Sequence, residues 1–408
     1  MRNRKFLSAF LCAAMAATML VGCGGKESDT TKKDNNNATQ KASEDTDKGS
    51  ETTEKVEIHH AYWHGAMTDY LTECEEKFEA ENSNIDIVLD YYDWGEYWTK
   101  LEAAAAGGEV ADVFQLNGPN NYKYADYGML LPLDDYIAGS DVDMDNYPEA
   151  LNKIYNIDGV QYGIPVDWDT IGLWYNKEIF DAAGVEYPNE NWTWEDLVAA
   201  AEKITDADAG IYGISAGYAD QGGFFNTVPA AGGYIVNEDG TKCGFDDEKT
   251  VKGLQIWEDL LKAGLSPSQA KLNETADTTL FTAGQLGMLM AGDWVIADFV
   301  AVEGFAGKFD AAMLPMIDGN RASCIHGKAN CISSVTENPD EAWAWVSYLA
   351  GQEANEMLGK SGAAIPAHTA CSNLFFEAYP DYNMKVLQED GRRVCCSISN
   401  ISWMAGMG

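Results

Sequence analysis

Basic residues are scarce in this chain of 408 residues, which has 27 Lys and Arg against 65 Asp and Glu and a formal net charge of −38. Such a surface repels phosphate backbones and anionic lipid headgroups, which excludes nucleic acid as a partner. The excess of carboxylates favours a neutral or cationic ligand, although it also serves solubility. Hydrophobic residues make up 46% of the chain and aromatic ones 11%, a globular composition long enough for two domains.

Several signatures of chemistry are missing as well. The chain has no His-Glu-x-x-His motif and no phosphate-binding loop. No Cys-x-x-Cys pair supports a zinc or redox site. His59 and His60 are neighbours on a predicted strand, so their side chains point to opposite faces and cannot hold one metal. We therefore expect no enzyme activity, no catalytic residues, no metal site and no cofactor.

The N-terminal apolar run, residues 6–21, is shorter than the roughly 20 residues of a permanent membrane span. It follows three basic residues and ends in Leu20, Val21, Gly22 and Cys23, a pattern typical of an export signal over residues 1–22. The ending resembles the bacterial lipoprotein box, in which the cysteine becomes the lipidated first residue. The resemblance implies an acylated Cys23 that anchors the protein on the outer side of the bacterial cell membrane.

Residues 24–55 contain no aromatic residue and no apolar residue larger than Ala. Such a segment cannot bury enough surface to offset its ordering entropy, so we expect residues 23–55 to be the lipidated cysteine and a flexible tether. Seven cysteines remain in the body, an odd number at irregular spacing: Cys74, Cys243, Cys324, Cys331, Cys371, Cys395 and Cys396. We expect free, mostly buried thiols, with one disulfide left open.

The body begins with alternating strands and helices. Apolar alternation predicts strands over residues 56–62 and 85–89, and a continuous apolar run predicts a third over 110–116. Helices are expected around residues 70–78 and over 96–106. This order is typical of a parallel α/β sheet, in which ligands bind in the loops after the strands. Those loops carry polar and aromatic side chains: Trp63, His64, Asp93, Trp94, Asn117 and Asn120.

Five motifs in register carry a family resemblance. They are Tyr-Gly-Ile-Pro at 162–165 before Tyr-Asn-Lys at 175–177, Trp-Thr-Trp-Glu-Asp at 192–196, Phe-x-x-Gly at 281–284 with Gly-Asp-Trp at 292–294, Asn-Pro at 338–339, and Ile-Pro-Ala at 365–367. In this order the sequence resembles the solute-binding lipoproteins of ATP-driven (ABC) importers, in the group that includes sugar and oligosaccharide receptors. The resemblance covers nearly the whole chain after the signal.

The resemblance implies a two-lobed periplasmic-binding-protein-like fold of type II. Each lobe would be a sheet flanked by helices, with a ligand cleft between the lobes. The first lobe would comprise residues 56–164 and 315–350, and the second lobe residues 165–314 and 351–408. The sequence stops where the family continues through further helix, so we expect a shortened or truncated end to the second lobe.

Ligand-binding residues follow from the same resemblance. Trp294 resembles the family's main stacking platform, with packing in the core as its structural alternative. The other candidates, for which loop, hinge or scaffold roles stay open, are Trp63, His64, Asp93, Asn117, Asn120, Asp167, Trp168, Asp169, Gln221, His326 and Trp403. Trp257, Trp343 and Trp345 lie on predicted helices and are expected to pack in the core.

Aromatic faces suit the C–H side of a sugar ring, and amides and carboxylates suit its hydroxyls. The predicted function is therefore capture of a mono- or oligosaccharide by hinge closure and its delivery to an ABC permease, by a monomer without catalysis. A polyamine or cation receptor of the same fold, in which carboxylates are boxed by aromatics, is the alternative. A surface glycosidase is a more distant one, because its two carboxylates carry no sequence signature.

Overall fold

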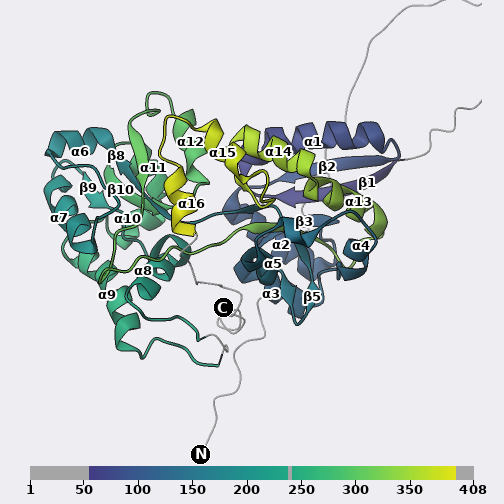
Figure 1. Cartoon of the computed structure of the whole chain (residues 1–408), viewed down its shortest axis with the longest axis horizontal. Coiled ribbons are helices and arrows are strands. Elements are labelled where there is room, and N and C mark those ends of the chain that lie inside the picture. The colour runs from purple at the N-terminus through teal and green to yellow at the C-terminus, as the bar shows by residue number, and fades with distance from the viewer. Residues whose placement is uncertain (1–54, 238–240, 392–408) are drawn as a thin grey trace, which may run out of the picture. The chain divides into compact units, whose positions relative to one another are not determined.

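The computed structural model describes residues 55–237 and 241–391, and two β-sheets dominate these residues (Figure 1). The predicted export signal, Cys23 and the tether up to residue 54 lie outside the described residues, as do Cys395, Cys396 and Trp403. None of the helices in the described ranges is both long and apolar enough to cross a membrane.

The first sheet has the strand order β2-β1-β3-β12-β6. β1 pairs in parallel with β2 and β3, whereas β12 pairs antiparallel with β3 and β6. The strands are β1 (Val56–Tyr62), β2 (Ile85–Tyr91), β3 (Val113–Asn117), β6 (Gly163–Pro165) and β12 (Lys328–Ile332). The crossovers are α1 (Thr68–Glu81) and α2 (Trp94–Gly107). The predicted order of strand, helix, strand, helix, strand is therefore confirmed.

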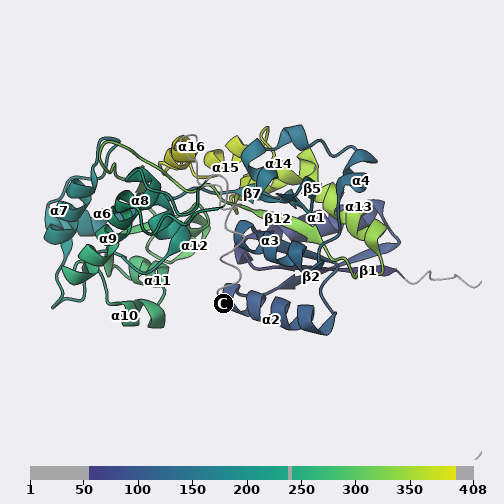
Figure 2. The same ribbon diagram turned by 90° about the horizontal axis from the view of Figure 1, so that it is seen from below.

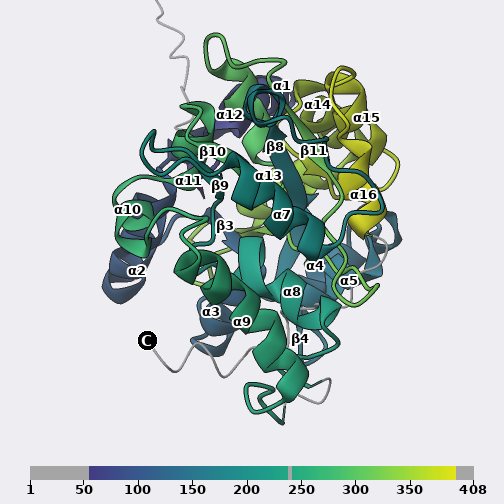
Figure 3. The same cartoon turned by 90° about the vertical axis from the view of Figure 1, so that its left-hand side faces the viewer.

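The second sheet has the strand order β11-β8-β10-β9. Its strands are β8 (Gly172–Asn176), β9 (Tyr212–Ile214), β10 (Leu286–Ala291) and β11 (Phe309–Ala312). Along β8, Trp174 belongs to one hydrophobic cluster while Leu173 and Tyr175 belong to another. Because side chains alternate between the faces of a strand, this sheet is buried on both faces. Helices α7 (Trp194–Ile204), α8 (Phe225–Ala230) and α9 (Glu248–Lys262) face the viewer in Figure 3.

Three chain segments connect the two sheets (Figure 2). The first leaves β6 and continues through β7 (Asp167–Trp168) into β8, and the second runs from β11 to β12. The third contains β13 (Ile365–Pro366), which pairs antiparallel with β7. Asp169 and His326 also exchange backbone hydrogen bonds of 3.0 Å, which ties the first segment to the second.

Two of the expected boundaries between the lobes differ from the structure. Residues 315–327 were expected in the first lobe, but Met316 pairs with the Trp192–Trp194 segment of the second, and the chain rejoins the first sheet only at Lys328. Residues from 351 onward were expected in the second lobe, yet α14 (Gln352–Ser361) packs against α1 and against α13 (Pro339–Ala350). Tertiary packing decides these placements, and hydrophobic periodicity does not report it.

The remaining helices and strands are short. They are α3 (Gly118–Asp126), α4 (Asp134–Ala138), α5 (Glu149–Ile154), β4 (Asn156–Ile157), β5 (Val160–Gln161), α6 (Lys177–Ala183), α10 (Gln269–Glu274), α11 (Asp277–Thr282), α12 (Val295–Ala301), α15 (Ser372–Ala378) and α16 (Lys385–Gly391). Single turns of other helix types cover Gly65–Met67, Met144–Asn146 and Asp220–Phe224.

The expectations of packed tryptophans and of mostly buried free thiols are met at the residues named here. Trp257, Trp343 and Trp345 are buried. Cys74, Cys331 and Cys371 are buried free thiols, and Cys243 is a half-buried one. Burial raises the pKa of the Cys74 thiol to about 12, so this group stays protonated and unreactive.

Candidate functional site

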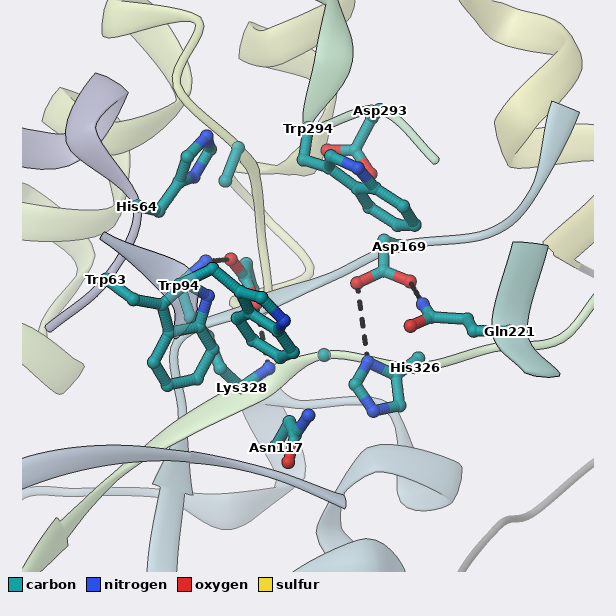
Figure 4. A pocket seen from close by; sticks show the side chains of 13 residues that line it. Trp63, His64, Trp94, Asn117, Asp169, Gln221, Asp293, Trp294, His326 and Lys328 are labelled. Atoms are coloured by element: carbon teal, nitrogen blue, oxygen red, sulfur yellow. Dashed lines mark hydrogen bonds and ion pairs between the residues drawn. The ribbon is translucent and has the colours of Figure 1, made fainter. Parts of the chain in front are cut away.

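A cavity of about 390 Å³ lies where the two sheets face each other, and both sheets supply its walls (Figure 4). Its lining residues are Trp63, His64, Trp94, Asn117, Asp167, Asp169, Gln221, Asp293, Trp294, His326, Gly327, Lys328 and Ala364. On the first-sheet side, Trp63 and His64 follow β1, Trp94 begins α2 after β2, and Asn117 ends β3. They lie together because the carboxyl ends of parallel strands meet at one sheet edge. The cavity thus lies where the α/β pattern of the sequence predicts ligand binding.

Tryptophans form two opposite walls of the cavity. Trp63 and Trp94 come from the first sheet's side, and Trp294 comes from the second, between β10 and α12 (Figure 4). The rings of Trp63 and Trp94 meet edge to face with centroids 5.4 Å apart. Such contacts fix ring orientation and leave apolar surface for a ligand.

Asp167 and Lys328 form a buried ion pair in the connection between the sheets. The Lys328 backbone N–H donates to Asp167 Oδ1 at 2.9 Å, and its ammonium donates to Oδ2. Both side chains are nearly inaccessible to solvent. Because each group neutralises the other, neither presents a free charge to the cavity.

Asp169 is held by two partners from different segments. Gln221 Nε2 donates to Asp169 Oδ1 at 2.6 Å, and His326 Nδ1 lies 3.6 Å from Oδ2. Gln221 belongs to the second lobe, whereas His326 lies just before β12. The carboxylate therefore links the second lobe to the segment that leads into β12.

Asp293 and His64 are both driven towards their neutral forms. Burial, followed by the charges of Asp169 and Asp167, raises the pKa of Asp293 well above its usual range. Its Oδ2 accepts a 3.4 Å hydrogen bond from the Ile365 backbone, and its Oδ1 is buried without a partner among the described residues. Burial, followed by the Lys328 charge, lowers the pKa of His64 to about 3. At neutral pH His64 is therefore uncharged, and the site favours the protonated form of Asp293.

Eight of the predicted site residues line this cavity: Trp63, His64, Asn117, Asp167, Asp169, Gln221, Trp294 and His326. Three others do not line it. Asp93 precedes α2 and accepts a 2.8 Å hydrogen bond from Tyr91, and Asn120 donates to Asn117 at 2.7 Å. Trp168 is buried against β13, with its Nε1 3.5 Å from Ser372 Oγ. A role in ligand binding stays a prediction for all eight, and Trp403 lies outside the described residues.

The cavity also has lining residues that are not among the predicted site residues, namely Trp94, Asp293, Gly327, Lys328 and Ala364. Of these, the sequence placed Trp94 in a ligand-side loop and offered Lys328 as a contact or a scaffold residue. Trp94 directly follows Asp93 in the same predicted loop. The sequence therefore indicated this loop, but the predicted site residue was Asp93, and it is Trp94 that lines the cavity. Asp293 precedes Trp294, but nothing local indicates that it is buried beside two other carboxylates. Within the described ranges, no cluster of three His, Cys, Asp or Glu side chains could hold a metal ion.

Two α/β lobes with an aromatic and polar cavity between them define a receptor for a small solute. The chain belongs to the bacterial extracellular solute-binding proteins, whose family model matches residues 61–356. This confirms the predicted family and the two-lobed α/β fold.

Three known proteins illustrate what the chain is similar to. It is 24% identical to a maltotriose-binding protein of Pyrococcus abyssi over 70% of this chain and 61% of that protein. It is 25% identical to an sn-glycerol-3-phosphate-binding periplasmic protein of Brucella abortus, over 73% and 68% of the two chains. An ABC substrate-binding protein of Listeria monocytogenes, solved in complex with cycloalternan, matches with a TM-score of 0.78 and 27% identity over 85% and 90%.

Proposed function

We propose that this protein is the substrate-binding lipoprotein of an ABC importer and captures a neutral carbohydrate. The observation that carries the proposal is the combination of tryptophans on opposite walls with carboxylates and amides between them (Figure 4). Stacked aromatic rings cover the C–H faces of a sugar, and Asn117, Asp169 and Gln221 supply hydrogen-bonding groups for hydroxyls. Similarity to sugar-binding receptors supports the same ligand class.

The charges of the cavity favour a neutral ligand over a charged one. Lys328 is the one Lys or Arg among the described residues that line it, and Asp167 already neutralises this lysine. A phosphate ester would therefore find no uncompensated cation. A polyamine would find Asp167 paired and Asp293 favoured in its protonated form. Of the three lining carboxylates, this leaves Asp169, already hydrogen-bonded by Gln221, for its ammonium groups.

We propose that the protein binds without chemistry. Residues 213–217 have the spacing Gly-x-Ser-x-Gly of a hydrolase nucleophile elbow. Here the buried Ser215 hydroxyl donates to Asp277 Oδ2 at 3.3 Å, and no histidine of the described residues activates it. Ligand contacts from both lobes would instead stabilise a closed form of the monomeric receptor. This closed form would then bind to a membrane permease.

The anchor is part of the same proposal. Cys23 would carry acyl chains and hold the receptor at the outer face of the cell membrane, with residues 24–55 as the tether. A Cys23→Ala variant should then appear in the soluble fraction, and it should no longer incorporate labelled palmitate. Membrane association of this variant equal to that of the wild type would contradict the anchor without touching the binding proposal.

A thermal-shift screen of the purified protein tests the ligand class. The panel contains neutral mono- and oligosaccharides, spermidine and glycerol-3-phosphate. A ligand at 100 times its Kd adds about 2.7 kcal/mol to the free energy of unfolding, which is easily seen as a rise in Tm. We expect a shift with one saccharide class. A shift with spermidine or glycerol-3-phosphate alone would overturn the proposal.

A further inference from the structure

Trp94 is unusual among the tryptophans of this protein because it is exposed. Its fractional exposure is 53%, and no other tryptophan within residues 55–237 and 241–391 is classed as exposed. An exposed indole lacks the burial of apolar surface that stabilises the other tryptophans. An exposed tryptophan at a cavity rim is therefore a candidate for covering by a ligand.

The position of Trp94 is nevertheless fixed. Its ring meets Trp63 at a centroid distance of 5.4 Å and Trp98 at 5.2 Å, both edge to face. Trp98 in turn contacts Tyr97 at 5.1 Å, and Tyr97 is buried and donates to the Gln115 carbonyl at 2.5 Å. The exposed ring is thus braced by a chain of contacts that reaches the first sheet. A braced ring loses little entropy when a ligand stacks on it.

Trp94 lies on the wall opposite Trp294, with the polar groups of the cavity between them (Figure 4). Trp294 is half-buried beside Asp169 and Gln221, whereas Trp94 is exposed, so we assign an inner sugar ring to the Trp294 side of the cavity. The cavity measures about 390 Å³, towards the lower end of the roughly 300–1,000 Å³ of small-molecule sites. Trp94 lines this same cavity and is its exposed tryptophan, so a ligand that extends from Trp294 towards solvent meets the Trp94 indole.

We infer that Trp94 forms an outer subsite that stacks on a second sugar ring, so that the preferred ligand is an oligosaccharide of at least two rings. This inference rests on the proposed carbohydrate function. It assigns the two walls separate tasks: Trp294 holds the inner ring in every ligand, and Trp94 contributes only when a second ring is present.

Calorimetric titration with matched sugar series tests the inference. The series are glucose, maltose and maltotriose; arabinose and its α-1,5-linked disaccharide; and N-acetylglucosamine with its β-1,4-linked disaccharide. In the series that binds, the disaccharide should bind at least tenfold more tightly than its monosaccharide. Trp94→Ala should weaken the disaccharide about tenfold and the monosaccharide less than about threefold.

Three further variants make the result decisive. Trp294→Ala should weaken the binding of both the monosaccharide and the disaccharide. Tyr127→Ala removes an aromatic ring that is 64% exposed and lies outside the cavity, and it should weaken the binding of neither. Trp94→Phe, with a smaller ring, should give an intermediate loss if Trp94→Ala alters the melting curve. Equal affinity for mono- and disaccharide, or equal losses for both in Trp94→Ala, overturns the outer subsite while the carbohydrate function stands. Binding of no sugar in any series overturns both.

Discussion

At the scale of single residues, Gly292 sets the position of Trp294. A Cβ built on Gly292 would overlap the six-membered ring of Trp294, so the indole lies directly over the glycine. Gly292→Ala should push the indole out of place and weaken saccharide binding about tenfold without removing any ligand contact. Calorimetry would measure this loss, and Gly107→Ala, where a Cβ meets nothing within 4 Å, is the matched control. Unchanged affinity in Gly292→Ala would show that Trp294 is not held there for binding.

His60 gives a second prediction at this scale. It is fully buried in β1, its Nδ1 accepts a 3.0 Å hydrogen bond from Trp345 Nε1, and burial lowers its pKa to about 4. Below pH 6.5, the ordinary pKa of histidine, His60 binds a proton in the unfolded chain but stays neutral in the folded chain until the pH approaches 4. Stability is therefore full above pH 6.5 and falls as the pH drops towards 4, by about 3 kcal/mol in total from this group.

Urea unfolding across pH 4.5 to 7.5 checks the direction of this pH dependence and its assignment to His60. The free energy of unfolding of the wild type should fall towards low pH more steeply than that of His60→Gln, which keeps an acceptor for Trp345 and cannot titrate. Parallel pH profiles for the two proteins would mean that His60 is not the group responsible.

At the scale of elements, α7 begins with a capping box. Asp196 N–H donates to Thr193 Oγ1 at 3.2 Å, and Thr193 N–H donates to Asp196 Oδ2 at 2.9 Å. Thr193→Ala should lower the free energy of unfolding by about 1 kcal/mol, because a helix donor loses its partner. Thr72→Ala, on the exposed face of α1, should cost nothing by the same denaturation assay. Equal effects of the two substitutions would contradict the assigned cap.

Elements also show what the sequence could and could not predict. The first two strands and the crossovers follow from periodicity over seven to fourteen residues, and the third strand follows from a continuous apolar run. The α7 cap follows from local capping chemistry. The strand pairing in the connections between the sheets could not be predicted, because β7 and β13 are two residues long and show no hydrophobic periodicity. The eight predicted residues that line the cavity came from strand ends and family motifs. Asp293 was not predicted, and the choice between contact and scaffold stayed open for Lys328, because residues distant in the chain build the environment of both.

At the scale of the whole molecule, the cavity walls belong to two lobes that three segments join. A ligand that contacts both walls should shift the population towards the closed form. Small-angle X-ray scattering should show a smaller radius of gyration with saturating saccharide than without it. Spermidine at the same concentration should leave the scattering curve unchanged. A ligand that binds by calorimetry and leaves the radius of gyration constant would contradict the hinge mechanism.

The most direct test of the account is calorimetric titration of the wild type and of Trp294→Ala with the saccharide that raises the Tm. We predict binding to the wild type and a loss of about 30-fold or more in the variant, the size expected of a central aromatic contact. Equal affinity of the two proteins would place the sugar elsewhere. Binding of spermidine or glycerol-3-phosphate in place of any sugar would contradict carbohydrate capture itself.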